Sequence, residues 1–237
     1  MSTLAIELRN VVKQRGKKPV LQGVNLEVPV GTVVGLLGRN GSGKSTLIKC
    51  ALGLLKLNTG ECRLLGEDSW DLSAAAKARI GYVPQVINLY PWMKVCEYVQ
   101  YTASFYARWN DSLANRLMNE WDLHGEDRIG TLSVGTLQKL AILTAVGHEP
   151  DLLILDEPAA SLDPLARRQF LQLIVDLAEP ERRSVLFSTH ITSDLERIAD
   201  TVAVLSDGRI THFGPMEELK AQTHLNLEDA FLEMIHE

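Results

Sequence analysis

The nine residues from Gly38 to Thr46 constrain the fold of this chain more than any other segment. They read Gly-Arg-Asn-Gly-Ser-Gly-Lys-Ser-Thr and fit the phosphate-binding loop pattern G-x-x-x-x-G-K-[ST]. That pattern requires a buried strand before the loop and a helix after it. Residues 33–37 are Val and Leu around one glycine, and residues 45–55 carry apolar side chains at helical spacing. We therefore expect strand, loop and helix in this order.

The chemistry of the loop suits a nucleotide. Gly38, Gly41 and Gly43 let backbone N–H groups curl around a polyphosphate, and the helix that follows adds its dipole. Lys44 brings a positive charge toward the β- and γ-phosphates, and Ser45 can offer its hydroxyl to Mg²⁺. The predicted site also includes the other residues of the loop: Arg39, Asn40, Ser42 and Thr46.

Composition and charge argue against several classes of protein. Hydrophobic residues make up 46% and charged residues 23% of the 237 residues, and no apolar run approaches the ~20 residues that span a bilayer. The first ten residues lack the features of a signal peptide, so a cytoplasmic address is expected. A net charge of −6 without a Lys or Arg cluster argues against direct nucleic-acid binding. Three cysteines without paired spacing argue against a disulfide framework and a zinc site.

Hydrophobic patterning predicts an α/β fold. Residues 4–8 and 24–28 alternate apolar and polar side chains, which is typical of half-buried antiparallel strands, and residues 13–18 are expected to connect them. A closing hairpin is predicted across Asp207-Gly208, from 201–205 to 209–213. The other predicted elements are strands at 62–65, 80–83, 152–155 and 185–188 and helices at 164–177 and 193–199.

Strand-like alternation stops between Pro84 and about Gly147, where helical spacing and aromatic residues take over. We interpret residues 85–147 as a helical subdomain inserted into a core made of residues 1–84 and 148–237, all within one domain. A helix would place four aromatic residues on one face: Tyr98, Tyr101, Phe105 and Trp109. That face is either a packing stripe or a docking groove for a partner's helix, and different residues can serve each role.

Two acids follow a predicted strand at residues 152–155. Such a strand would lie beside the loop strand and place Asp156 and Glu157 at its carboxyl end, where α/β sheets bind ligands. Consecutive strand residues point in opposite directions, so the two acids are expected to have different tasks. Asp156 suits the Mg²⁺ shell, and Glu157 suits the polarisation of a water aimed at the γ-phosphate.

Three further polar residues stand at the ends of predicted elements. Gln85 lies where the core meets the helical subdomain, and its amide can reach a metal or a water. His190 ends another strand, where its imidazole can hydrogen-bond a γ-phosphate. Asp163 precedes a proline and fits a helix N-cap. Each of the three, taken alone, also suits a purely structural role.

Residues 132–139 begin a second helix with anion-binding character. Ser133 and Gly135 stand at its start, together with free backbone N–H groups. The nucleotide bound by the phosphate loop does not account for this second anion-binding helix start. The alternative is a capped helix without a ligand.

These segments, in this order, resemble the ATP-binding subunit of ABC transporters, and the resemblance covers almost the whole chain. It implies a P-loop NTPase core with an N-terminal antiparallel β portion and an inserted α-helical subdomain, working with ATP and Mg²⁺. It also implies that two such subunits, identical or sister chains, pair head to tail. Ser133, Gly135 and Asp163 of one subunit would then contact the ATP that Lys44 of the other holds.

The sequence departs from the family pattern at two places. The usual Leu-Ser-Gly-Gly-Gln signature is Leu-Ser-Val-Gly-Thr here, with Val134 and Thr136 in place of the glycine and the glutamine. The family also tends to place an aromatic residue near Gln14-Arg15 to stack on adenine, and this chain has none there. Arg15 can stack its guanidinium plane instead, or contact with the base is weak.

The function that we expect is ATP hydrolysis that drives a separate transmembrane permease, with export as the direction. Glu157 would be the general base, assisted by Gln85 and His190, and the subunit would sit at the inner face of the membrane. One alternative is an ABC-type ATPase that acts on DNA or ribosomes, although such proteins usually carry a coiled-coil insert or two cassettes. A kinase-like monomer leaves Ser133 and Gly135 unexplained.

Overall fold

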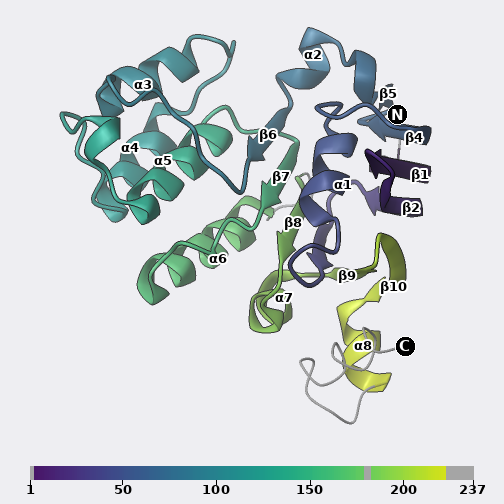
Figure 1. The fold of residues 1–237 in the computed structure, drawn as a ribbon. Helices are drawn as coiled ribbons and strands as arrows, with labels where there is room; N and C mark the ends of the chain where they lie inside the picture. The colour runs from purple at the N-terminus through teal and green to yellow at the C-terminus, as the bar shows by residue number, and fades with distance from the viewer. Residues whose placement is uncertain (1–2, 179–182, 223–237) are drawn as a thin grey trace.

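The strand before the phosphate loop lies inside a six-stranded sheet of the computed structural model, which describes residues 3–178 and 183–222 (Figure 1). The strand order in this sheet is β10-β9-β3-β8-β7-β6. All neighbouring pairs are parallel except β10 and β9. Its strands are β3 (Val33–Leu37), β6 (Ile80–Val83), β7 (Leu152–Asp156), β8 (Ser184–Thr189), β9 (Thr201–Ser206) and β10 (Arg209–Pro215).

Strands β3, β7 and β8 are buried along their whole length, as expected for central strands of a parallel sheet. Strand β8 lies between β3 and β7, so the prediction that the strand before Asp156 lies directly beside the loop strand was wrong. The register pairs Leu37 with Thr189 and Asp156 with Ser188. The carboxyl ends of three strands that are far apart in the sequence therefore meet at one edge, directly beside the phosphate loop.

A second, antiparallel sheet has the strand order β2-β1-β4-β5. Its strands are β1 (Leu4–Arg15), β2 (Lys18–Pro29), β4 (Thr59–Leu64) and β5 (Glu67–Asp68). The prediction that residues 13–18 form a connection was wrong, because β1 and β2 remain paired up to Arg15 and Lys18. The turn needs only two residues, since Gly16 adopts a positive φ of 63°.

The helices are α1 (Lys44–Ala51), α2 (Ala74–Lys77), α3 (Val95–Ala103), α4 (Asp111–Glu120), α5 (Val134–Val146), α6 (Pro164–Ala178), α7 (Thr192–Ile198) and α8 (Met216–Gln222). The helix predicted to run to Leu55 ends at Ala51. Gly53, just beyond this end, takes a φ of 67° that turns the chain away from the helix axis. The hairpin predicted across Asp207-Gly208 is confirmed, and both turn residues have positive φ.

Helices α3, α4 and α5 lie together on one side of the strands (Figure 1). The prediction of one aromatic helical face was wrong, because α3 ends at Ala103 and only Tyr98 and Tyr101 belong to it. Tyr98 and Trp109 pack against the hydrophobic core, whereas Tyr101 and Phe105 are exposed. Packing and exposure therefore divide the four residues between the two interpretations.

Two hydrophobic clusters cover the two faces of the six-stranded sheet, and β3 contributes to both. Val34 and Leu36 pack with α1 and the antiparallel sheet, whereas Val33 and Leu37 pack with α5 and α6 on the other face. The loop after β3 is thus held between two packed layers. None of the helices described, in residues 3–178 and 183–222, is long and apolar enough to cross a membrane.

The three cysteines, Cys50, Cys62 and Cys96, are free thiols. Burial is the main cause that raises the pKa of Cys62 to about 12, so its thiol is protonated and unreactive at neutral pH.

Candidate nucleotide site

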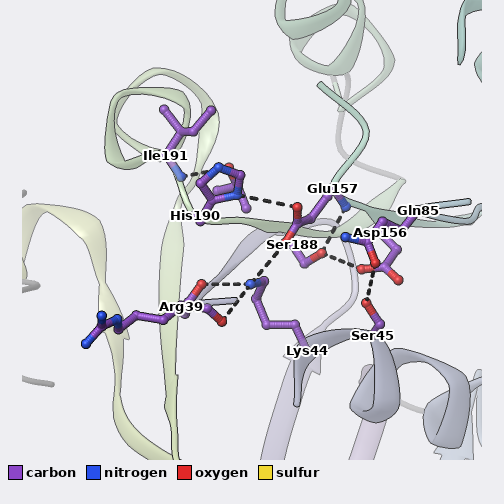
Figure 2. Close-up of polar contacts among 11 residues, drawn as sticks. Arg39, Lys44, Ser45, Gln85, Asp156, Glu157, Ser188, His190 and Ile191 are labelled. Atoms are coloured by element: carbon purple, nitrogen blue, oxygen red, sulfur yellow. Dashed lines mark hydrogen bonds and ion pairs between the residues drawn. The ribbon is translucent and has the colours of Figure 1, made fainter. Parts of the chain in front are cut away.

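The phosphate loop forms the floor of a cleft of about 590 Å³. Gly43 shows why a glycine is required there: its φ is 110°, and a Cβ atom would lie 3.1 Å from the Val20 carbonyl oxygen. The loop residues that line the cleft are Asn40, Gly41, Ser42, Gly43, Lys44, Ser45 and Thr46. Gly38 and Arg39 take part through their backbone carbonyls, and in Figure 2 the Arg39 side chain points away from Lys44.

Lys44 is almost wholly buried, and three acceptors surround its ammonium group. Nζ donates to the Gly38 carbonyl at 2.7 Å and to the Arg39 carbonyl at 3.2 Å, and it lies 3.1 Å from Glu157 Oε1. An ammonium group has three N–H donors. All three are therefore occupied within the chain, and a phosphate group can approach only by replacing one of these partners.

Glu157 directs its carboxylate toward Lys44 from the opposite side of the cleft (Figure 2). The residue follows β7 and adopts a φ of 50°, which is uncommon for a residue other than glycine. Its second oxygen, Oε2, lies 3.4 Å from His190 Nδ1. The sequence predicts that strand alternation separates the two acids, but β7 ends at Asp156. The left-handed turn at Glu157 gives the two acids different partners instead.

Asp156 is the last residue of β7 and is completely buried. Its Oδ1 accepts a hydrogen bond of 2.8 Å from the Ser188 hydroxyl, whereas Oδ2 is buried without a hydrogen-bond partner. Buried polar atoms are almost always paired, since an unpaired one loses its hydration without compensation. The free oxygen is therefore a site where a ligand or a cation would fit.

The oxygens around Asp156 suit Mg²⁺. Gln85 Oε1 accepts from the Ser45 hydroxyl at 3.3 Å, so a hydroxyl, an amide and a carboxylate oxygen gather beside the loop (Figure 2). Hard oxygen ligands of this kind, few in number and completed by water and phosphate, are those that Mg²⁺ prefers. A protein-only cage is not formed, because no group of three or more His, Cys, Asp or Glu in the described part of the chain is placed to hold a metal.

The second predicted anion site lies elsewhere in the structure. Ser133 is the N-cap of α5, and its hydroxyl oxygen accepts the Thr136 N–H at 3.1 Å. A Cβ atom on Gly135 would lie 3.1 Å from the Ser161 carbonyl oxygen, so the helix start packs against the segment that leads to Asp163. None of Ser133, Gly135 and Asp163 lines the cleft above the chain's own phosphate loop.

Asp163 caps helix α6, as the sequence predicts. Its Oδ1 accepts the backbone N–H groups of Leu165 and Ala166 at 3.0 and 2.9 Å. These bonds hold the pKa of Asp163 below its ordinary value, and the bond from Ala166 has the largest effect. The carboxylate therefore stays ionised at the edge of the segment that contacts Gly135.

Arg15 lines the cleft from the hairpin of β1 and β2. Sequence reasoning missed its neighbours Pro19 and Val20, which supply an apolar part of the same wall, and Asp207 and Gly208 at the other rim. These residues lie outside the nucleotide-binding motifs. The pairing of β1 with β2 and the turn between β9 and β10 bring them to the cleft.

Comparison with known proteins places the chain in a family. Residues 21–160 match the family model described as ABC transporter. A Nod factor export ATP-binding protein I of Burkholderia orbicola is 35% identical over 214 residues, which cover 88% of this chain and 70% of that protein.

Solved structures share the fold along most of their length. An ATP-binding subunit of an ABC transporter superposes with a TM-score of 0.88 at 29% identity, covering 98% of this chain and 99% of that chain. A dimeric ATP-binding cassette in a post-hydrolysis state, bound to ADP and phosphate, has a TM-score of 0.79 at 25% identity, covering 89% of this chain and 98% of that chain. These matches confirm the predicted fold class of an α/β core with an antiparallel β portion and added helices. The chain belongs to the ABC transporter family and is one of its ATP-binding, ATP-hydrolysing subunits.

Proposed function

We propose that this chain hydrolyses Mg-ATP as one half of an ATP-dependent pair of subunits and so drives a separate membrane permease that exports its substrate. The observation that carries the proposal is the division of the machinery. Lys44, Asp156 and Glu157 converge on one cleft, whereas Ser133 and Gly135 lie outside it. A site that is incomplete in one chain requires a second chain to close it.

In this proposal the phosphate loop and Lys44 bind the triphosphate. The γ-phosphate replaces Glu157 as the third partner of the Lys44 ammonium group. Ser45, Gln85 and Asp156 hold Mg²⁺, which neutralises part of the phosphate charge when it is bound. Arg15 stacks its guanidinium group against the base at the rim of the cleft.

Glu157, once released from Lys44, acts as the general base. A water molecule attacks the γ-phosphorus, its proton passes to a Glu157 carboxylate oxygen, and ADP leaves as the β–γ bridging bond breaks. His190 lies 3.4 Å from that carboxylate. It therefore stands where its imidazole can hydrogen-bond the γ-phosphate and keep Glu157 aligned.

The partner subunit supplies the lid over this site. Its Ser133 and Gly135 approach the γ-phosphate, and its Asp163 orders the adjoining segment. Support comes from the dimeric cassette in the post-hydrolysis state that this chain resembles, and from Val134, which is 65% exposed at the start of α5. A large apolar side chain exposed at this position would be covered when two subunits meet.

The proposed permease contact lies on a connected set of aromatic rings in the helical region. Tyr90 touches Trp92, Tyr98 and Tyr101 at centroid distances of 5.3, 6.2 and 5.9 Å, and Tyr101 touches Phe105 at 4.9 Å. Trp92 and Phe105 are each 65% exposed. Exposed aromatic rings of this kind are enriched in protein interfaces, and the patch continues from the segment that carries Gln85. The subunit would thus work at the inner face of the membrane, and export follows the relative named for Nod factor export.

The Glu157→Gln variant tests the two-chain mechanism. It keeps the shape of the side chain and removes the base, so Mg-ATP should still bind while turnover falls by about 10²–10⁴-fold. An ATP-bound dimer should then accumulate and elute earlier in size-exclusion chromatography with Mg-ATP than without it. A wild-type protein that hydrolysed ATP at full rate as a dilute monomer would overturn the mechanism.

The permease itself is tested by copurification of a tagged chain from detergent-solubilised membranes. Recovery of one polytopic membrane protein with the chain supports the transporter assignment. Recovery of ribosomal or DNA-bound partners instead would favour an ABC-type ATPase that works away from membranes.

A further inference from the structure

Ser188 joins the two acidic residues of the site through a single hydroxyl group. The residue lies on β8, is completely buried, and stands opposite Asp156 in the register of the sheet. Its Oγ donates to Asp156 Oδ1 at 2.8 Å and accepts the Glu157 backbone N–H at 3.0 Å (Figure 2). A hydroxyl has one proton, so with its proton on Asp156 it can accept from Glu157, and both bonds can form at once.

The bond to Asp156 decides which carboxylate oxygen stays available. Oδ1 is occupied by Ser188, and Oδ2 is buried without a partner. A free carboxylate can rotate and offer either oxygen, whereas a carboxylate held on one side offers only the other. Hydrogen bonds to the ligands of a metal orient those ligands in this way.

The bond to Glu157 acts on the backbone. The φ of 50° at Glu157 belongs to the left-handed region, which costs free energy for a residue with a side chain. Donation of its N–H to Ser188 holds this turn at the point where the chain leaves β7. This turn places Glu157 Oε1 at 3.1 Å from Lys44 Nζ.

We propose that Ser188 is a positioning residue that orients the metal-binding oxygen of Asp156 and the general base Glu157 together. It touches neither the nucleotide nor the metal, and it acts only through the two acids. The inference rests on the proposed Mg-dependent hydrolysis. A Mg²⁺ titration of the wild-type protein tests that function separately.

The experiment compares Ser188→Ala with Ser184→Ala. Ser184 lies on the same strand, is 1% exposed, and its hydroxyl accepts the Gly31 N–H at 3.0 Å, far from the acids along the strand. Both variants lose a buried hydroxyl group that accepts a backbone N–H, and only Ser188→Ala also loses a bond to Asp156. Three quantities are measured for each variant: the Mg²⁺ concentration that half-saturates binding of fluorescently labelled ADP, and kcat and KM for ATP at saturating Mg²⁺.

For Ser188→Ala we expect the half-saturating Mg²⁺ concentration to rise and kcat to fall, each by about 10–100-fold, as is usual when a residue that orients a metal ligand is removed. Labelled ADP in excess EDTA should bind at least as tightly as it does to the wild type, since the phosphate loop is unchanged. Ser188→Thr, which retains the hydroxyl, should recover most of both quantities. Ser184→Ala should change neither.

A Ser188→Ala protein with wild-type Mg²⁺ dependence would overturn the proposal, even with a lowered melting temperature. Equal Mg²⁺ shifts in the two alanine variants would overturn it as well, because the effect would then be general loosening of β8. If Ser188→Ala does not fold, Ser188→Cys takes its place, since a thiol has similar shape but donates weakly. Mg²⁺ affinity is then expected to decrease from the wild type through Ser188→Thr to Ser188→Cys.

Discussion

Lys44 Nζ lies 3.1 Å from Glu157 Oε1, and the two side chains are only 4% and 7% exposed. The contact joins the lysine of the phosphate loop to the group that we propose as general base. In the proposed mechanism the γ-phosphate takes the place of Glu157 beside Lys44. We infer that nucleotide binding separates the pair and leaves the carboxylate free to face a water molecule.

Glu157→Gln should consequently bind ADP more tightly than the wild type. The neutral amide competes less well for Lys44, which also serves the β-phosphate of ADP, and affinity should rise by up to about tenfold, which corresponds to ~1.4 kcal/mol. The measurement is the Kd for ADP at a protein concentration at which the chain elutes as a monomer, so that the value reports the single-chain effect. Asp163→Asn serves as a control acid outside the cleft and should leave the Kd unchanged. A weaker affinity in Glu157→Gln would show that the ion pair does not oppose binding.

Arg15→Ala should weaken ATP binding by up to tens of fold. A guanidinium group stacked on an aromatic ring contributes on the order of 0.5–2 kcal/mol, and Arg15 lines the cleft. Nucleotide Kd is compared between the wild type, Arg15→Ala and Lys17→Ala, the last being a neighbouring cation of the same turn that does not line the cleft. Equal values for Arg15→Ala and the wild type would assign Arg15 to the solvated turn.

A mixture of Lys44→Ala and Ser133→Arg chains should hydrolyse ATP, although each variant alone should not. Mixed pairs keep one intact composite site, made from Lys44 of one chain and Ser133 of the other, so up to about half of the wild-type rate per pair should return. The assay is steady-state ATPase at a constant total concentration and varied ratio. A shared site would be ruled out if the ATPase rate of every mixture equalled the sum of the rates of its two variants measured separately.

Ser133→Arg also removes a helix cap, which is worth about 1 kcal/mol, so a capping control is needed. Ser73 caps α2 in the same way, accepting the Ala76 N–H at 3.1 Å. Ser73→Arg should lower the melting temperature modestly and retain ATPase activity. Loss of activity in both variants would point to instability and not to the lid.

Phe105→Ala and Trp92→Ala should weaken copurification with the permease while the fold persists. Each ring is 65% exposed and contributes little to the core, whereas a buried interface ring often contributes 2 kcal/mol or more to binding. Trp70→Ala is the matched control, since Trp70 is 58% exposed beside the antiparallel sheet. The patch is not the docking surface if all three variants retain the permease equally.

The free energy of unfolding should fall as pH drops below about 6.5, in part through His148. The ring is buried and stacked on Tyr106 at 3.9 Å, its Nε2 faces the Ile80 carbonyl at 3.2 Å, and Nδ1 has no partner. Burial is the main cause that lowers the pKa of His148 below its ordinary value of 6.5. As the pH falls, His148 is therefore protonated in the unfolded chain before it is protonated in the folded chain. Its contribution to the free energy of unfolding is complete above pH 6.5 and is lost as the pH falls.

The check is urea unfolding at pH 7.5 and pH 5.5 of the wild type, His148→Phe and His124→Gln. Phe keeps the aromatic stack and cannot titrate, so His148→Phe should lose less stability on acidification than the wild type. His124, with its side chain 67% exposed, should behave as the wild type. Identical pH slopes in all three proteins would remove His148 from the explanation.

The sequence by itself determined the parts of this protein whose chemistry is local. The phosphate loop needs a strand, glycines and a lysine within a few residues, and the strand that precedes Asp156 is apolar from residue to residue. Caps at Ser133 and Asp163 also depend on neighbours three residues away. Such features can be recognised from the sequence because the interacting groups are separated by less than one helical turn or one strand.

Tertiary structure alone decided the contacts between β7 and β8 and those across the cleft. The pairing of Asp156 with Ser188 joins residues 32 positions apart, and nothing in either local pattern fixes that register. The structure also departs from the local patterns at three places: the left-handed turn at Glu157, the length of the hairpin of β1 and β2, and the end of α3 at Ala103. The reason is physical: local patterns specify which face of an element is buried, but only the packed sheet specifies which residue stands opposite which.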